Sequence, residues 1–261
     1  MAELLKVNIT KQELESGIVP QNHVLMLMDF SSEGAKTKSG IIYGVLPDIT
    51  YADPDNLDDT SAHAADMAET SGVIVKLPQE LYFNPDDNNS MAWECDMDLE
   101  VGDRVFTNPI ESQNAVTLVC EDKLYKFIPY SDCYVAKRVG RHYTYMSGNT
   151  NQEEYVICLN GMTLCEQLPR PKLSELDTVN NDTIDKTRGK IAYLGKPNKR
   201  HRSDAVADFE DLKVGDVVLF DKKYTPFALE RQKYNSKFDS EKLYFVVPRC
   251  RIVAVIKRDN G

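Results

Sequence analysis

The chain has 261 residues, enough for one large domain or two small ones, and 42% of them are hydrophobic. Acidic residues outnumber basic ones by 41 to 31, so the formal net charge is −10. This balance disfavours a protein that coats nucleic acid, because phosphate contacts require clustered positive charge. No apolar run reaches the roughly 18 residues of a membrane-spanning helix, and the first ten residues lack the apolar core of a secretory signal.

Short β-strands are the main elements that the sequence predicts. A leader, residues 1–18, contains a candidate helix over Lys11–Ser16, and a second candidate lies at Ala62–Glu69. Apolar runs separated by turn residues predict strands at 24–28, 72–75, 101–106, 115–119, 124–128 and 133–136. A second series follows at 162–168, 190–194, 214–220, 242–247 and 251–257. Strands at this spacing are typical of a sandwich or a barrel, so the predicted class is all-β.

The two series of strands are copies of one pattern. Residues 99–106 read LEVGDRVF, and residues 212–220 read LKVGDVVLF. Matching segments before and after this motif recur in the same order at a nearly constant separation. The sequence therefore predicts two copies of one domain, over residues 19–138 and 152–261, joined by a polar connector over residues 139–151.

These motifs resemble those of the GroES-like co-chaperonins. The resemblance covers the Leu-x-Val-Gly-Asp pattern with its following strand, the Thr-Arg-Gly strand start at Thr187–Gly189, and the closing apolar strand of each copy. It implies two tandem GroES-like, partly open antiparallel β-barrels. It also implies a cytoplasmic homo-oligomeric ring that caps a chaperonin, with no catalytic residues, cofactor or metal of its own.

The resemblance assigns a chaperonin-binding loop to the first copy. Five residues after a polar stretch resemble the apolar anchor of the family's mobile loop: Gly40, Ile41, Ile42, Tyr43 and Gly44. A loop that orders only on binding gives modest affinity, which several loops in a ring would multiply. The alternative is an ordinary barrel strand, because Ile and Tyr have high β propensity.

Several features depart from the family pattern. An Asp-rich insert over residues 47–69 follows the loop, and residues 172–186 of the second copy lack the apolar triplet. A chain of two domains also cannot build a seven-domain ring, because seven is odd. These departures favour an alternative function, a structural component of a large assembly. An auxiliary or capsid-decorating virion protein, with neighbouring structural proteins as partners, is one example.

The one dense basic cluster of the sequence lies at residues 196–202, where the family places a roof hairpin. Lys199, Arg200 and Arg202 are candidates for contact with an acidic partner, and a solvated loop tip is the alternative. Acidic stretches at 53–66 and 86–98 do not fit a calcium-binding loop, so we expect no metal site.

Motifs of enzymes are missing from the sequence. The four histidines are scattered, and no glycine-rich nucleotide-binding motif occurs. The six cysteines form no CxxC pair, which argues against a zinc site and against a disulfide framework. We therefore expect a non-enzymatic protein in a reducing intracellular compartment.

Overall fold

The computed structural model describes residues 6–31, 35–36, 42–43, 71–108, 115–143, 150–170, 184–224, 226–228 and 243–257. Strands dominate these residues, which confirms the predicted all-β class. Two compact units divide the chain: unit 1 comprises residues 1–82 and 97–155, and unit 2 comprises residues 83–96 and 156–261. The second candidate helix, Ala62–Glu69, lies outside the described residues.

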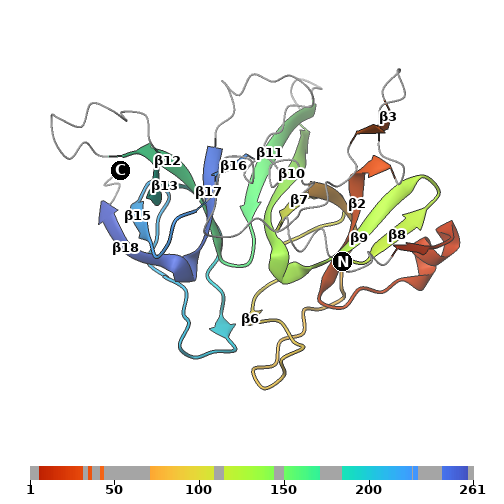
Figure 1. Cartoon of the computed structure of the whole chain (residues 1–261), viewed down its shortest axis with the longest axis horizontal. Coiled ribbons are helices and arrows are strands. Elements are labelled where there is room, and N and C mark those ends of the chain that lie inside the picture. The colour runs from red at the N-terminus through yellow and green to blue at the C-terminus, as the bar shows by residue number, and fades with distance from the viewer. Residues whose placement is uncertain are drawn as a thin grey trace. The chain divides into compact units, whose positions relative to one another are not determined.

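Unit 1 is built on an eight-stranded sheet with the order β1-β8-β9-β2-β5-β7-β10-β11 (Figure 1). In that order the strands are Lys6–Asn8, Thr117–Cys120, Lys123–Pro129, His23–Ser31, Ser71–Lys76, Arg104–Thr107, Cys133–Tyr143 and Thr150–Cys158. β1 runs parallel to β8, and the pairs from β8 to β10 are antiparallel. β10 and β11 extend into the range 139–151 that the sequence predicts as a polar connector, because valine and tyrosine near its start favour strands.

Unit 2 contains a six-stranded sheet with the order β16-β17-β12-β13-β15-β18. In that order the strands are Pro226–Ala228, Leu243–Pro248, Met162–Pro169, Ile184–Leu194, Val217–Phe220 and Ile252–Lys257. Two small sheets pair β3 (Ala35–Lys36) with β4 (Ile42–Tyr43) and β6 (Trp93–Glu94) with β14 (Arg200–His201). Across the described residues both large sheets keep two edge strands, so neither closes into a barrel.

The two large sheets share one strand order. The series β8-β9-β2-β5-β7-β10 corresponds strand by strand to β16-β17-β12-β13-β15-β18. Bulges fall at equivalent places, between Leu25 and Met26 in β2 and between Leu164 and Cys165 in β12. A short helical segment precedes the last strand of each series, η2 (Tyr130–Asp132) in unit 1 and η4 (Arg249–Arg251) in unit 2. The units therefore follow one chain path, in keeping with the repeat in the sequence.

A glycine stands at one position of both repeats because the neighbouring strand approaches closely. A Cβ added to Gly72 would lie 2.7 Å from the carbonyl oxygen of Leu27. A Cβ added to Gly189 would lie 2.6 Å from the Cβ of Cys165. Both distances are too short for any side chain, which explains the recurring glycine in β5 and β13.

The core of unit 2 collects buried side chains from five strands and from the loop before β15. Its members are Cys165, Ile191, Leu212, Val218, Phe220, Phe245, Val247 and Ile252. The rings of Phe220 and Phe245 meet edge to face with centres 5.9 Å apart, a favourable aromatic arrangement. The apolar runs found in the sequence thus supply this core.

The leader is part of the fold of unit 1. β1 pairs with β8, and the helical segment η1 (Glu13–Gly17) overlaps the helix predicted over Lys11–Ser16. The amide of Thr10 donates to the carboxylate of Glu13 at 2.7 Å, and the amide of Glu13 donates to the hydroxyl of Thr10 at 3.2 Å. This reciprocal pair caps the helical turn. Three apolar side chains of the leader pack against the sheet: Ile9, Leu14 and Ile18.

The Leu-x-Val-Gly-Asp motif forms the same turn in both units. The backbone angle φ is +99° at Gly102 and +96° at Gly215, a conformation that glycine adopts at little cost. The carboxylate of Asp103 accepts a hydrogen bond from the amide of Glu100 at 2.7 Å, and Asp216 accepts the equivalent bond at 3.0 Å. Both aspartates are buried, so the motif is a structural device.

The surroundings of the two turn aspartates differ. Arg138 donates two hydrogen bonds to Asp103, from Nε at 2.8 Å and from Nη2 at 2.7 Å. Oδ1 of Asp216 is buried and has no hydrogen-bond partner in the part of the chain that the structure describes. A buried carboxylate oxygen without a partner loses its bonds to water and gains no bond in exchange. Asp216 therefore contributes less to the stability of the fold than Asp103 does.

We expect Asp103→Asn to lower the free energy of unfolding by about 1–3 kcal/mol, because it removes the buried one of the two carboxylates that pair with Arg138, the other being the exposed Glu100. Asp216→Asn keeps an oxygen acceptor for the turn amide and removes a buried charge, so the free energy of unfolding should stay level or rise. Urea denaturation of both variants and the parent chain measures the difference. A larger loss for Asp216→Asn than for Asp103→Asn would contradict this account.

Burial separates the six cysteines, none of which is in a disulfide, into two groups. Cys95 and Cys250 are partly exposed, whereas the other four are buried. Burial raises the pKa of Cys158 to about 12, and it also raises the pKa of Cys133 and Cys165. Since the thiolate is the reactive form, these buried thiols should be inert in the folded chain.

Iodoacetamide added to the native protein at mildly alkaline pH should therefore modify Cys95 first. Cys250 should react more slowly, because burial raises its pKa as well. All six thiols should react in denaturant, and peptide mass spectrometry reads out each site. Modification of Cys133 or Cys165 as fast as Cys95 in the native chain would show that the core opens readily.

Candidate functional site

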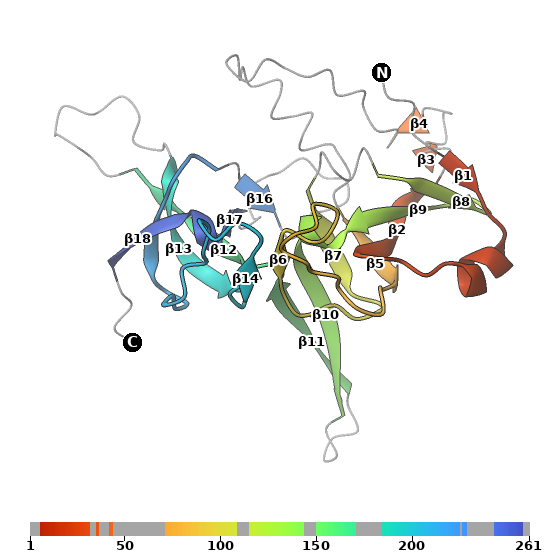
Figure 2. The ribbon, with the colours of Figure 1, turned by 90° about the horizontal axis from the view of Figure 1, so that it is seen from below.

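The segment 83–96 lies within the first repeat of the sequence but belongs to unit 2. The chain leaves unit 1 after residue 82 and returns to it at residue 97. Within unit 2, β6 of this segment pairs antiparallel with β14 (Figure 2). We call the contacts between residues 83–96 and residues 198–208 the clasp.

The basic cluster singled out in the sequence meets acidic side chains of this segment. Nζ of Lys199 lies 2.6 Å from Oδ1 of Asp96, and Nε of Arg200 lies 3.6 Å from Oε2 of Glu94. The hydrogen bond and the charge of Lys199 lower the pKa of Asp96. More than half of each side chain in the Lys199–Asp96 pair is exposed, so water screens the attraction between the two charges. The pair therefore orients the two segments but adds little to the stability of the fold. The acidic groups that face these two cations belong to the same chain.

Other contacts of the basic cluster involve an aromatic ring and the backbone. The guanidinium carbon of Arg200 lies 4.9 Å from the centre of the Phe83 ring, a cation–π distance. Nη1 of Arg202 donates to the carbonyl oxygen of Asp87 at 3.0 Å, and its amide donates to the carbonyl oxygen of Ala92 at 2.9 Å. Backbone pairing and side-chain contacts thus hold the same segment.

A buried histidine–aspartate pair lies within residues 198–208, the side of the clasp that carries the basic cluster. Nε2 of His201 lies 3.1 Å from Oδ1 of Asp208, and the two side chains are only 9% and 3% exposed. Oδ2 of Asp208 accepts a hydrogen bond from the amide of Asn198 at 2.7 Å. The ring of Trp93 lies 6.1 Å from the ring of His201, and its indole nitrogen donates to Asn160 at 3.3 Å. Trp93 is therefore a strand residue of the clasp.

Arg249 secures both ends of the loop that carries the basic cluster. Its guanidinium donates to the carbonyl oxygens of Gly195 at 2.6 Å, Phe209 at 3.0 Å and Glu210 at 2.7 Å. Burial lowers the pKa of Arg249, yet these three acceptors compensate the loss of water. The loop is thus anchored from the core side while the clasp holds its other side.

The contacts of the clasp are of the kind that hold one segment of a chain against another. In the described part of the chain, no three His, Cys, Asp or Glu side chains come together as metal ligands. The imidazole of His201 is engaged with Asp208 and the cations face carboxylates, an arrangement that orients a neighbouring strand. Sequence reasoning missed this pairing, for which the only signal was the opposite charge of the stretches 86–98 and 196–202.

The structure describes part of the predicted chaperonin loop. Ile42 and Tyr43 form β4, which pairs with β3. Three residues of the predicted anchor lie outside the described residues: Gly40, Ile41 and Gly44. The acidic stretch at 53–66 lies outside them as well.

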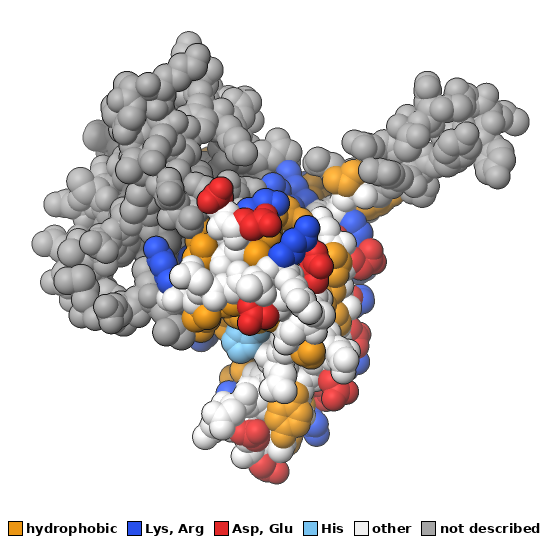
Figure 3. Space-filling view, turned by 90° about the vertical axis from the view of Figure 1, so that its right-hand side faces the viewer, with side chains coloured by type: hydrophobic (Ala, Val, Ile, Leu, Met, Phe, Trp, Pro, Cys, Tyr) orange, Lys and Arg blue, Asp and Glu red, His pale blue; other side chains and the backbone are white. Residues whose placement is uncertain are grey.

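Surface charge is mixed on the face shown in Figure 3. Among the coloured side chains of this view, which belong to the described residues, Lys and Arg lie among Asp and Glu without a patch of one sign. Nucleic-acid interfaces concentrate positive charge, so this face does not have their character. In the described ranges, no helix is both long and apolar enough to cross a bilayer.

No family model, no curated protein and no solved structure matches the chain. The fold and the clasp define an all-β protein of two repeated units in which one unit incorporates a segment of the other repeat. Arguments about function therefore start from the internal repeat, from the sequence motifs and from the contacts described above.

We expect Asp208→Ala to loosen the clasp, because it deprives the Asn198 amide and the His201 ring of their shared acceptor. Each lost bond to a charged acceptor costs about 1–3 kcal/mol. Hydrogen exchange of the Lys199 and Arg202 amides should accelerate roughly tenfold or more, if these amides exchange by local opening.

Asp204→Ala is the matched control, because Asp204 is an exposed aspartate of the same loop. This variant should exchange like the parent chain at both amides. Equal acceleration in the two variants would mean that the loop, and not the Asp208 network, governs the opening.

Proposed function

We propose that this chain is a non-enzymatic co-chaperonin-like protein, made of two tandem GroES-like domains, that caps a chaperonin and assists protein folding. The observation that carries the proposal is the repeated unit, in which one strand order and one buried Gly-Asp turn occur twice. The motifs that build this unit are the ones through which the sequence resembles the co-chaperonins.

The loop Gly40–Gly44 would provide the contact with the chaperonin. Its apolar residues follow a polar stretch, and Ile42 and Tyr43 form a two-residue strand. A two-residue strand can detach and pair elsewhere at low cost, since a two-stranded sheet alone is only marginally stable. Such a loop favours reversible capping.

Oligomerisation would multiply this weak contact. Each chain supplies two domains and one loop with the apolar triplet, so three or four chains would give a ring of six or eight domains. Several loops acting together bind more tightly than any single one. A homo-oligomer is therefore part of the proposal.

A second candidate function is a structural component of a large assembly, in a cell or a virion. The clasp favours it, because segment 83–96 is held inside unit 2 by backbone pairing, by ion pairs and by the ring contact of Trp93 with His201. Internal fastening suits a rigid building block. In that role neighbouring structural proteins would be the partners.

The proposed capping predicts that Ile42→Asp abolishes binding to a chaperonin, because a carboxylate cannot enter an apolar groove without losing its hydration. Size-exclusion chromatography with light scattering, run alone and with a chaperonin plus ATP, measures this. The parent chain should co-elute only with nucleotide present.

Leu176→Asp is the control, since this residue lies in the segment of the second repeat that stands in place of the loop. It should leave co-elution intact. Unchanged binding of Ile42→Asp would remove the loop from this role. Absence of binding by the parent chain, together with a fixed stoichiometry in purified native particles, would support the assembly component.

A further inference from the structure

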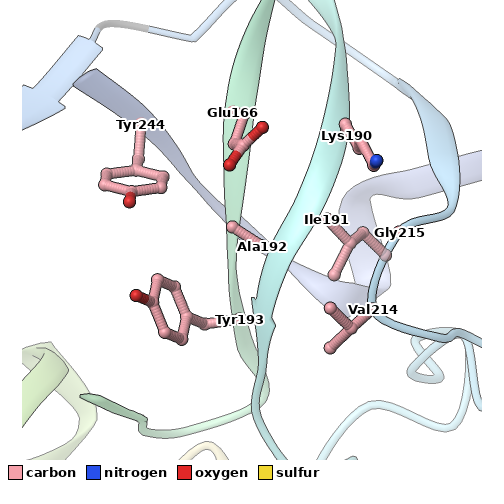
Figure 4. Close-up of a pocket in the computed structure, with 8 residues that line it drawn as sticks. All are labelled: Glu166, Lys190, Ile191, Ala192, Tyr193, Val214, Gly215 and Tyr244. Carbon is pink, nitrogen blue, oxygen red and sulfur yellow. The ribbon is translucent and has the colours of Figure 1, made fainter. Parts of the chain in front are cut away.

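A pocket of about 330 Å³ lies on the sheet of unit 2. Strands β12, β13 and β17 and the turn before β15 form it. The side chains that matter here are Glu166, Lys190, Ala192, Tyr193, Val214 and Tyr244. Figure 4 shows the two tyrosine rings on one side of the strands and Val214 on the other. A volume of this size can take up a few side chains of a ligand.

The pocket combines aromatic surface with a polar row. The rings of Tyr193 and Tyr244 meet at an angle of 64° with centres 6.0 Å apart. In the sheet, Glu166 pairs with Lys190 on one side and with Tyr244 on the other. Opposite charges on neighbouring strands attract each other and leave a polar strip beside the rings.

Strand register identifies the same surface in unit 1. There Leu27 pairs with Val73 on one side and with Tyr125 on the other, as Glu166 pairs with Lys190 and Tyr244. Along the next strand, Val75 and Lys76 stand where unit 2 has Ala192 and Tyr193. The turn valines Val101 and Val214 correspond through the shared Gly-Asp motif.

In unit 1 this surface holds the leader. The apolar side chains of the leader, like those of Leu27 and Val75, pack against a buried cluster that includes Tyr125. Nζ of Lys76 donates to the carbonyl oxygens of Glu15 at 2.9 Å and Ile18 at 3.0 Å. The surface thus binds the amphipathic leader through aliphatic contacts and through the Lys76 ammonium group, which donates to main-chain carbonyl oxygens near the end of the leader.

The residues that precede β12 form β11, a strand of the eight-stranded sheet next to β10. Among the described residues before β12, there is therefore no equivalent of residues 6–18. Unit 2 retains the tyrosine and a hydrogen-bond donor, since the hydroxyl of Tyr193 replaces the ammonium group of Lys76.

We propose that the pocket of unit 2 binds a short amphipathic peptide segment of a partner protein, similar in chemistry to the leader. Aliphatic side chains of that segment pack on Tyr244, Ala192 and Val214, and a main-chain carbonyl accepts a hydrogen bond from Tyr193. Glu166 and Lys190 replace the aliphatic Leu27 and Val73, so the pocket prefers a more polar segment than the leader. This site is separate from the loop Gly40–Gly44.

The test uses a fluorescently labelled synthetic peptide with the sequence of residues 6–18 and the full chain. The chain's own leader occupies the surface of unit 1, so the free peptide reports on unit 2. Fluorescence anisotropy should show saturable, weak binding. Val214→Asp and Tyr193→Ala should each weaken it roughly tenfold or more, the size of effect expected for a contact at the centre of an interface.

Val101→Asp is the matched control, because Val101 is 65% exposed and Val214 is 60% exposed at equivalent turns. It should bind the peptide like the parent chain. The double variant Glu166→Leu, Lys190→Val restores the residues of unit 1 and should bind it more tightly. Ile42→Asp should have no effect, which separates this site from the proposed capping function.

Two results would overturn the proposal. One is absence of saturable binding by the parent chain. The other is binding that Val214→Asp and Tyr193→Ala leave unchanged, or that Val101→Asp weakens equally, since the peptide would then exchange with the leader on unit 1. Circular dichroism of each variant verifies that the sheets are intact.

Discussion

A buried carboxylate at a tight turn is the constraint on which both units depend. Asp103 and Asp216 each accept a backbone amide of their own turn. The turn then joins the neighbouring strand, because the amides of Gly102 and Gly215 donate to the carbonyl oxygens of Ile74 and Ile191 at 2.9 and 2.8 Å. These main-chain bonds stand where β7 pairs with β5 in unit 1 and where β15 pairs with β13 in unit 2.

The shared strand order gives the two units equivalent surfaces that carry different side chains. In unit 1 the leader covers one surface of the sheet, with aliphatic contacts and the bonds from Lys76. In unit 2 the equivalent surface retains a tyrosine but exchanges an aliphatic pair for Glu166 and Lys190. The same backbone can therefore bind its own chain at one site and present a recognition surface at the other.

The clasp combines exposed ion pairs, which contribute little to stability, with backbone hydrogen bonds. Its ion pairs are exposed and orient the segment, while backbone pairing holds the segment against residues 198–208, within which His201 and Asp208 form a buried pair. Breaking a buried polar network costs more than breaking an exposed ion pair, because the remaining partners cannot be rehydrated. Incorporation of segment 83–96 makes unit 2 dependent on a piece of the first repeat.

The sequence by itself determined the all-β class, the position of most strands, the helical turn in the leader and the repeated Gly-Asp turn. These features depend on local patterns, such as β-branched runs and a glycine with positive φ, which the neighbouring residues specify. Only the tertiary structure decided that Lys199 and Arg200 face acidic residues of the same chain, and that Tyr193 and Tyr244 share a pocket. Such contacts join segments that lie far apart in the chain, and their partners depend on strand order and register, which composition and spacing do not specify.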